Sequence, residues 1–328
     1  MNVTIRAFEE DQDDDYAAAV AIRNVVTPDH PSTVQEMKDG DRRRDPKCHY
    51  GRWLAEKEGV AVGYGGYGQS AWAYHPQRFG INIAVLPDQE GRGIGGALHR
   101  HLLSALEQFR PTELHTSIRE DWERGLRFVQ DRGFSEEMRE WESRLEVSTF
   151  DPSPWAEARE KPARHGILLH SYAELAADPE RDRKLHALIV QTFADVPSTI
   201  PLTPPSLALY ELQVLQHPNF LPDGLMIAVD EKSGAYVGSS EVTRRQTDRD
   251  LDTGLTGVLP DYRRKGIALA LKLRVIDYAK SLGTPVIRTE NATTNRAMLA
   301  INEAFGFEKQ PVWIQFAHRT PQNEGPHR

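Results

Sequence analysis

The chain contains an internal repeat, and this feature restricts its fold more than any other. Val85–Asp88 (Val-Leu-Pro-Asp) recurs as Val258–Asp261, an offset of 173 positions. The pairs that follow at the same offset are Gly93-Ile94 with Gly266-Ile267, Ala97-Leu98 with Ala270-Leu271, and Gly133-Phe134 with Gly306-Phe307. A constant offset without insertions indicates two copies of one structural unit. The sequence therefore predicts two similar domains in tandem.

Both copies show the same order of predicted elements: a strand, helical segments, two strands joined by a turn, a strand that leads into a helix, a further strand and a last helix. In the first copy Thr33–Glu36 has the pattern of a helix-starting capping box. Gly133 and Gly306 fit the left-handed position after a helix. The main expected elements are Val3–Arg6, Tyr16–Val26, Trp53–Glu56, Val60–Tyr67, Ile81–Val85, Ile94–Phe109 and Leu114–Ile118, then Ile167–His170, Arg181–Phe193, Ser206–Gln216, Leu225–Val229, Tyr236–Val242, Thr253–Val258 and Val286–Thr289.

The repeat and the proline content suggest where the domains begin and end. We expect an N-terminal domain over residues 1–150 and a C-terminal domain over 167–317. The segment 151–166 contains Pro152, Pro154 and Pro162 and is expected to be a linker. The polar segment 318–328 is expected to be a disordered tail.

The composition excludes several classes of protein. Cys48 is the single cysteine among 328 residues, so the chain has no internal disulfide and no cysteine-rich metal site. No apolar run approaches the length of a membrane helix, and the acidic N-terminus lacks the pattern of a secretion signal. A net charge of −8 argues against nucleic acid as the main partner. We expect a cytoplasmic protein that binds neither membranes nor nucleic acid.

A glycine-rich loop, Gly91–Gly96, lies between a predicted strand and a predicted helix. Unpaired N–H groups at a helix start bind phosphate, and glycine lets the phosphate approach the backbone. The same residues satisfy the dinucleotide pattern GxGxxG, but the second copy, Arg263–Ala268, keeps the turn and loses that spacing. The loop therefore favours a phosphate-bearing ligand other than a Rossmann dinucleotide. A tight turn without a ligand is the alternative.

The second loop, Arg-Arg-Lys-Gly-Ile-Ala at Arg263–Ala268, resembles the acetyl-CoA signature Arg/Gln-x-x-Gly-x-Gly/Ala of the GNAT superfamily of N-acetyltransferases. Glu90–Gly95 matches this signature except that Glu90 stands at the Arg/Gln position. The segments Asn291–Met298 and Ile301–Phe307 also look like those of bacterial tandem GNAT proteins. The resemblance covers almost the whole chain.

This resemblance implies an α/β (α+β) fold of two tandem GNAT-like domains, each a mixed, mostly antiparallel sheet flanked by helices. It also implies acetyl-CoA as cosubstrate, no metal, and direct attack of a small amine on the thioester. In such domains the pantetheine arm lies beside a splayed strand and the pyrophosphate at the loop. The residues that it assigns to CoA are Ile83, Val85, Gly91, Arg92, Gly93, Ile94, Gly95, Gly96, Thr256, Val258, Arg263, Arg264, Lys265, Gly266, Ile267, Ala268, Asn291 and Asn295.

The sequence departs from the family pattern at the position of the tyrosine that often protonates the leaving thiolate. This position is Val129 in the first copy and Asn302 in the second, and Trp122 replaces the asparagine that the second copy keeps as Asn295. The second copy is the better candidate for the chemistry, with Asn302 and Glu241 as its candidate catalytic residues. Asp252 is a further candidate base. A solvated carboxylate at a strand end is the simpler interpretation of both Glu241 and Asp252.

Two hypotheses about function remain open at this point. The first is an acetyl-CoA-dependent N-acetyltransferase of a small primary amine. The second is a non-catalytic acyl-CoA-binding protein in which one or both copies have lost activity. The sequence identifies neither the acceptor amine nor the copy that holds CoA, and it leaves open whether the chain forms a homodimer.

Overall fold

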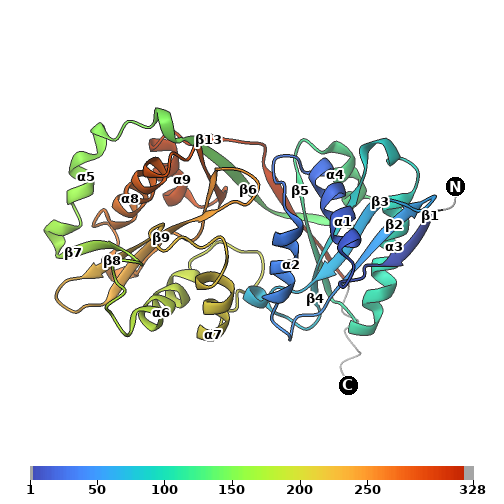
Figure 1. Cartoon of the computed structure of the whole chain (residues 1–328), viewed down its shortest axis with the longest axis horizontal. Coiled ribbons are helices and arrows are strands. Elements are labelled where there is room, and N and C mark those ends of the chain that lie inside the picture. The colour runs from blue at the N-terminus through green and yellow to red at the C-terminus, as the bar shows by residue number, and fades with distance from the viewer. Residues whose placement is uncertain (1–2, 321–328) are drawn as a thin grey trace, which may run out of the picture. The chain divides into compact units, whose positions relative to one another are not determined.

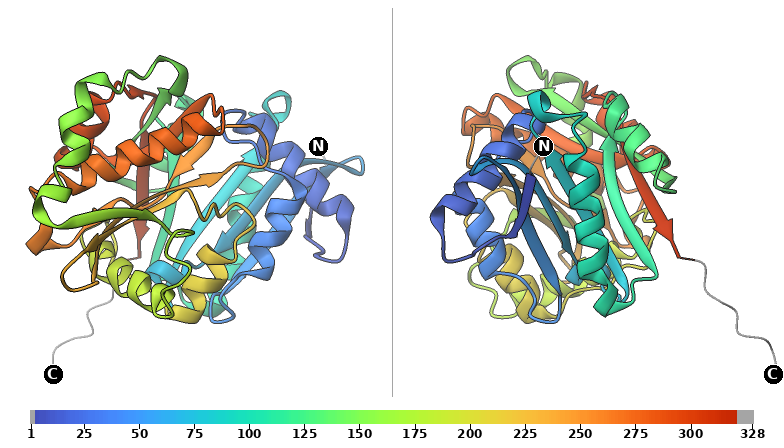
Figure 2. Two further views of the ribbon diagram at one scale, coloured as in Figure 1. Left: turned by 60° about the vertical axis from the view of Figure 1, so that its left-hand side comes forward. Right: turned by 90° about the vertical axis from the view of Figure 1, so that its right-hand side faces the viewer.

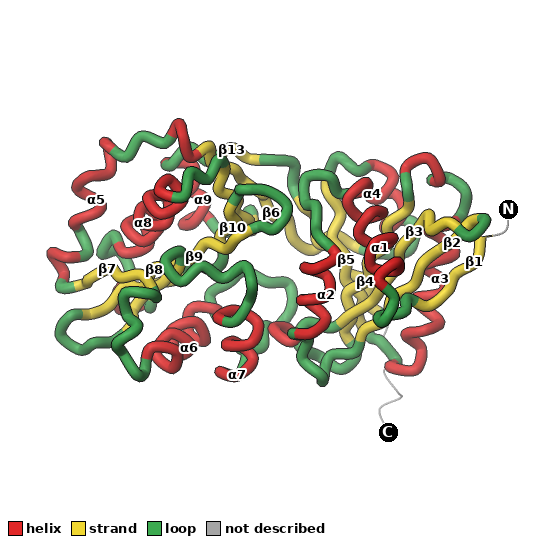
Figure 3. The backbone as a smooth tube through the Cα atoms, viewed as in Figure 1, coloured by secondary structure: helices red, strands yellow, loops and turns green. Residues whose placement is uncertain are grey.

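The computed structural model describes residues 3–320, which divide into two compact units. Unit 1 runs up to Glu137 and resumes at Ile314, and unit 2 comprises Met138–Trp313. Each unit contains a mixed, mostly antiparallel sheet that carries helices (Figure 1; Figure 3). This is the fold class that the sequence predicts.

The sheet of unit 1 has the strand order β1-β2-β3-β4-β5-β14, followed by the first residues of β6. Neighbours from β1 to β4 are antiparallel, and β5 is parallel to β4. The elements are β1 (Val3–Ala7), α1 (Asp13–Val26), α2 (Val34–Arg42), β2 (Tyr50–Lys57), β3 (Val60–Gly68), β4 (Arg78–Val85), α3 (Ile94–Leu106), β5 (Glu113–Arg119), α4 (Glu123–Gln130), β6 (Ser135–Glu146) and β14 (Trp313–Arg319).

Different helices cover the two faces of this sheet (Figure 2), and apolar residues are buried beneath them. On one face, Ala19 and Ile22 of α1 pack against strand residues that include Tyr64. On the other, Ile94 and Leu98 of α3 pack against residues of β2 and β3. The predicted capping box is confirmed, because the Thr33 side chain accepts from the N–H of Glu36 and the Glu36 side chain accepts from that of Thr33.

The sheet of unit 2 has the order β6-β12-β10-β9-β8-β7, with β11 paired to β9 and β13 to β6. One large core lies between this sheet and α8, whose Ile267, Leu271 and Val275 are almost fully buried. The elements are α5 (Ala156–Glu160), β7 (Ile167–Ser171), α6 (Arg181–Phe193), α7 (Leu207–Tyr210), β8 (Leu225–Asp230), β9 (Tyr236–Arg244), β10 (Leu251–Thr253), β11 (Gly257–Val258), α8 (Ile267–Ser281), β12 (Val286–Ala292), α9 (Arg296–Ala304) and β13 (Glu308–Lys309).

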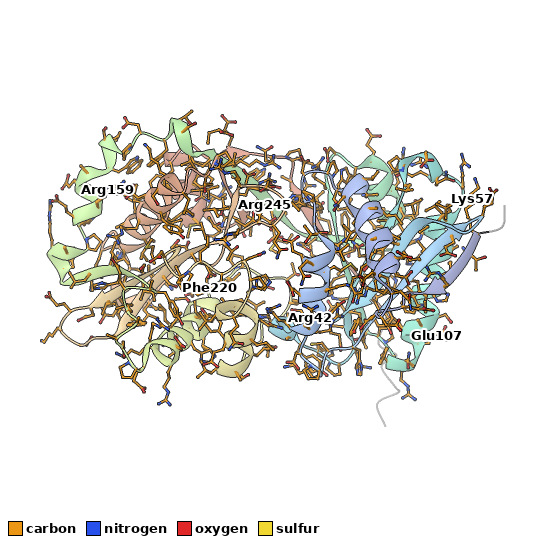
Figure 4. All side chains as sticks on the ribbon, in the orientation of Figure 1. Arg42, Lys57, Glu107, Arg159, Phe220 and Arg245 are labelled. Carbon is orange, nitrogen blue, oxygen red and sulfur yellow. The ribbon has the colours of Figure 1, made fainter. Side chains whose placement is uncertain are left out.

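The segment expected to be a linker, 151–166, is part of unit 2. It contains α5, and Trp155 and Ala158 pack against the core under α8. Arg159 (Figure 4) pairs with Asp277 of α8, and its Nη2 lies 2.9 Å from Oδ1 of that carboxylate. This proline-containing segment is therefore packed against unit 2 and is not a separate linker between the domains.

The last strand also departs from the expected boundaries. β14 leaves unit 2 after Trp313 and lies between β5 and β6 in the sheet of unit 1. Its residues His318 and Arg319 were expected in a disordered tail but belong to the strand, whereas 321–328 lie outside the described residues. The repeat shows which segments are similar in sequence, while hydrogen bonding decides which sheet a strand joins. Within residues 3–320, no helix is both long and apolar enough to cross a membrane.

Candidate active site

In unit 1, β4 and β5 separate after a short common stretch. Their ladder consists of three pairs, Arg78–Gly80 with Glu113–His115, while β4 stays paired to β3 as far as Val85. Beyond Gly80 the backbone of β4 therefore lines an opening in the sheet. A segment of extended ligand can add itself to such an exposed strand edge through backbone hydrogen bonds.

The direction of the backbone groups follows from one hydrogen bond. The N–H of Leu86 donates to Val62 O at 3.0 Å, so Leu86 and every second residue before it bond to β3. The N–H and C=O groups of Val85 and Ile83 consequently point to the other side, into the opening. The pantetheine contacts that the resemblance assigns to Ile83 and Val85 need this orientation and stay a prediction.

Unit 2 opens in the same way, with an irregularity that unit 1 lacks. β10 pairs with β12 at Leu251 and Asp252, whereas β11 pairs with β9. The predicted strand Thr253–Val258 is interrupted between these two, and the register against β9 changes by one residue, which is a β-bulge. The bond from Leu259 N–H to Val237 O (2.9 Å) directs the backbone groups of Thr256 and Val258 into the opening.

The glycine loop of unit 1 lies under helix α4. A β-carbon on Gly91 would meet Arg124 at 3.1 Å, one on Gly95 would meet Phe128 at 3.3 Å, and one on Gly96 would meet Arg132 at 3.5 Å. Because these three residues of α4 and its end follow each other at intervals of four, they form one stripe over the loop. Close helix packing is thus a second reason for the glycines, beside the approach of a phosphate.

The charges around this loop are mixed. Glu90, the residue that departs from the family signature, forms an ion pair with Arg124 (Nε to Oε2, 3.0 Å). Gly93 is the N-cap of α3 in the left-handed conformation (φ 82°), and a β-carbon there would meet nothing within 4 Å. Space therefore remains at Gly93, at the positive end of α3, and Arg92 is the residue directly before it in the loop.

The loop of unit 2 has the same backbone with different neighbours. Gly266 is the left-handed N-cap of α8 (φ 78°), and Arg264 is also left-handed (φ 63°). The stem of Lys161, from the segment before β7, lies over Gly266, with Cδ 3.0 Å from the position of a β-carbon. Arg263 donates to Val258 O at 3.1 Å and pairs with Asp195. Cationic side chains therefore gather at the N-terminus of α8.

Glu241 is placed at the point where β10 and β11 separate. Its side chain lies directly over Gly254, where a β-carbon would approach Glu241 Cγ at 2.6 Å, so any side chain at residue 254 would have to displace Glu241. The Leu255 N–H in the bulge donates to the carboxylate, and the second oxygen, Oε2, is buried without a hydrogen-bond partner. Burial raises the pKa of Glu241 from 4.5 to about 7, against the opposing effect of the Leu255 N–H.

Two neighbours distinguish Glu241 from the other candidate base. Buried Tyr210 of α7 lies near enough for the Glu241 charge to contribute to the raised pKa of its phenol, which burial raises most. Asp252 instead pairs with Arg245 (labelled in Figure 4), 3.1 Å from Nη1 to Oδ2. The Asp252 carboxylate is already held by an arginine, so Glu241 is the stronger candidate.

The three asparagines of unit 2 have different surroundings. Asn295 is the N-cap of α9 and accepts from Met298 N–H at 3.3 Å. Asn302, 2% exposed, donates to Asn291 Oδ1 at 2.6 Å, and its own Oδ1 is buried without a partner. Asn291 and Asn302 thus form a polar contact between β12 and α9. In unit 1 the corresponding Val129 is buried and apolar.

One group of possible metal ligands occurs in unit 1. Glu113, His115 and Glu137 each bring a donor atom within 4.8 Å of the others. Arg78 pairs with Glu113 at 2.7 Å, and Arg319 pairs with both glutamates. These arginines already balance the carboxylate charge, so the cluster is a network of ion pairs.

Several residues of the site escaped the sequence analysis. They are Gly254, Leu255, Tyr210, Lys161 and the bonded pair Thr253 and Thr289. The one signal for them was Gly254 itself, because a glycine inside a strand pattern indicates a bulge. The other residues are brought to the site by tertiary contacts that no local pattern records.

Comparisons with known proteins bear on the fold and the family of the chain. The model of the acetyltransferase (GNAT) family matches residues 10–134 and 196–307. The chain is similar in structure to a tandem GNAT protein from the clavulanic acid biosynthesis pathway, with a TM-score of 0.76 and 18% identity over 98% of this chain and 100% of that one. It is also similar to a GCN5-related N-acetyltransferase from Sphaerobacter thermophilus, with a TM-score of 0.72 and 16% identity over 97% and 95% of the two chains.

At these identities the solved structures support the fold alone, and no curated protein sequence matches the chain. The family model, in contrast, matches well over half of the residues, in one segment for each copy of the repeat. The chain belongs to the GNAT acetyltransferase family.

Proposed function

We propose that the chain is an acetyl-CoA-dependent N-acetyltransferase of a small primary amine, and that the reaction takes place in unit 2. The observation that carries this proposal is Glu241, whose carboxylate oxygen Oε2 is buried without a hydrogen-bond partner at the point where the sheet opens. A general base is most effective when its pKa lies near the working pH, and the pKa of Glu241 is about 7.

Unit 2 offers groups that fit both ends of the cosubstrate. The N-terminus of α8, with Gly266 and the cations Arg264 and Lys161 beside it, suits the phosphates. The outward backbone groups of Thr256 and Val258 suit the amides of the pantetheine arm. When bound there, acetyl-CoA supplies the acyl group as a thioester.

The residues of the chain then manage the proton. An amine is largely protonated at neutral pH and attacks only as the free base. Glu241 accepts the proton of the attacking amine at Oε2, while the Leu255 N–H holds the carboxylate in place. As the C–N bond forms, the C–S bond of the thioester breaks, and CoA leaves as a thiolate that takes up a proton to become the free thiol. Asn302 has no ionisable proton, so we assign it, with Asn291, a hydrogen-bonding role and not that of an acid.

The acceptor would lie on the face of the sheet that carries α6 and α7, because Glu241 and Tyr210 meet on that face. We also propose that the acceptor is a small molecule and that the protein is located in the cytoplasm. We further propose that unit 1 contributes structure and not turnover, since Glu90 pairs with Arg124 at its loop and Val129 replaces the acid.

Calorimetric titration of acetyl-CoA into wild type, Gly93→Asp and Gly266→Asp tests the assignment. An aspartate adds a negative charge where the phosphates are expected. Gly234→Asp is the control, because Gly234 is left-handed (φ 68°) like Gly93 and Gly266 but lies in the β8–β9 turn; like Gly93, it has open space around it. Gly266→Asp should remove binding that Gly234→Asp retains. Wild type that binds no acetyl-CoA would refute the proposal.

Activity is then measured as the release of free thiol from acetyl-CoA in the presence of a panel of primary amines. Turnover that Gly266→Asp abolishes and Gly93→Asp leaves unchanged would support unit 2 as the reaction centre. The reverse pattern would transfer the reaction to unit 1. Tight binding without turnover of any amine would favour the non-catalytic alternative.

A further inference from the structure

The opening in unit 2 ends at a pair of threonines. Leu251 pairs with Ile287 and Asp252 with Arg288, so Thr253 and Thr289 are the next residues in register. Their backbones are no longer part of the ladder, but Thr253 Oγ1 donates to Thr289 Oγ1 at 2.7 Å. This hydroxyl pair is the last cross-connection between the strands, and beyond it the strands separate.

The space behind this pair is filled. Leu251 and Ile287, two residues earlier on the same strands, point to the same face and are buried in the core under α8. Thr289 itself is 4% exposed. A group that enters the opening from the α8 loop therefore meets two hydroxyl groups that already satisfy each other, with a packed core behind them.

The position of the thioester relative to this pair follows from Glu241. Glu241 contacts Gly254 and accepts from Leu255, the residues directly after Thr253. If the attacking amine gives its proton to Glu241, the thioester carbon lies beside Gly254 and Leu255. The phosphates lie at the other end of the opening, at Gly266, so the acyl group is directed towards Thr253 and Thr289.

We propose that the Thr253–Thr289 pair closes the acyl-binding pocket of unit 2 and restricts the donor to short acyl groups such as acetyl. This inference rests on the proposed function. A longer acyl chain would have to separate the two hydroxyls and leave both buried without partners, or displace the core behind them. One methylene in a closed pocket commonly changes discrimination by roughly tenfold or more.

The test compares the binding of acetyl-CoA, butyryl-CoA and CoA to the full chain by calorimetry. The part of the binding that is lost in Gly266→Asp is assigned to unit 2. Wild type should bind acetyl-CoA at least about tenfold more tightly than butyryl-CoA. Thr289→Ala should reduce this preference about tenfold by improving the affinity for butyryl-CoA. Thr253→Ala opens the pair from the less buried side and should do the same if Thr289→Ala does not fold.

Thr284→Ala is the matched control, because Thr284 is also buried (6% exposed) but precedes β12 and lies outside the opening. It should leave the preference unchanged. Equal affinity of wild type for acetyl-CoA and butyryl-CoA, or an unchanged preference in both Thr289→Ala and Thr253→Ala, would overturn this inference and leave the proposed function intact. Absence of binding of any CoA compound by wild type would overturn both.

Discussion

Replacement of Glu241 by glutamine should make unit 2 more stable and the enzyme much slower. Gln keeps the size of the side chain and an oxygen that can accept from Leu255 N–H. It removes the base, so kcat should fall about 10²- to 10⁴-fold. It also removes the cost of burying a carboxylate, so the free energy of unfolding should rise.

The size of this gain depends on pH. The pKa of Glu241 is raised from 4.5 to about 7, and a shift of one pKa unit corresponds to roughly 1.4 kcal/mol. Below pH 4.5 the group is protonated in both the folded and the unfolded chain, and the substitution should gain nothing. Between pH 4.5 and 7 the unfolded chain loses the proton first, so wild type loses stability progressively. Above pH 7 the gain from Glu241→Gln should reach its limit, about 3 kcal/mol.

Urea denaturation at pH 4.5 and pH 8, followed by circular dichroism, measures this difference. Glu231→Gln is the control, because Glu231 is exposed and lies in the β8–β9 turn. For wild type, kcat should rise with pH through an apparent pKa near 7, and this rise should be absent from Glu241→Gln. A gain in stability of equal size at both pH values, or full activity in Glu241→Gln, would refute the assignment of Glu241 as a buried base.

Three further predictions concern single side chains of unit 2. Lys272 of α8 is 4% exposed, and burial lowers its pKa from 10.5 to about 8. In urea denaturation, Lys272→Met should therefore raise the free energy of unfolding by up to about 3 kcal/mol below pH 8. This gain should be lost between pH 8 and 10.5, and the control Lys280→Met, at an exposed lysine, should show no gain. Gly254→Ala should displace the Glu241 carboxylate, so kcat, measured by thiol release, should fall strongly, while the melting temperature, measured by calorimetry, should fall only slightly. Asn295→Ala should cost about 1 kcal/mol in urea denaturation through loss of the α9 cap, while Asn295→Asp should retain most of it.

Local patterns predict the elements of this fold well where the signal is contained in the element itself. The helix Arg181–Phe193 has the bounds that the sequence indicates, and Gly133 and Gly306 are left-handed as expected. The strand Thr253–Val258 is interrupted, because the bulge depends on a side chain from β9 that occupies the space over Gly254. Such a contact joins residues that are far apart in the sequence.

The candidate site divides in the same way. The backbone directions of Ile83, Val85, Thr256 and Val258 follow from strand alternation, and the contacts with CoA assigned to these residues stay a prediction. The packing of α4 over the first glycine loop could not be inferred, since it needs the distance between two helices. The raised pKa of Glu241 also needed the structure, because burial and an unpartnered oxygen are properties of the folded chain.

The location of β14 has a consequence for how the protein is made. Unit 1 needs β14 to complete the sheet beside β5, yet this strand follows the whole of unit 2 in the sequence. During synthesis, the first unit must therefore wait with an open edge at β5 while all of unit 2 is produced. An exposed strand edge invites pairing with other chains, so a chain that stops before β14 should aggregate even though the glycine loop of unit 1 is intact. A strand that is synthesised after unit 2 thus completes the sheet of unit 1.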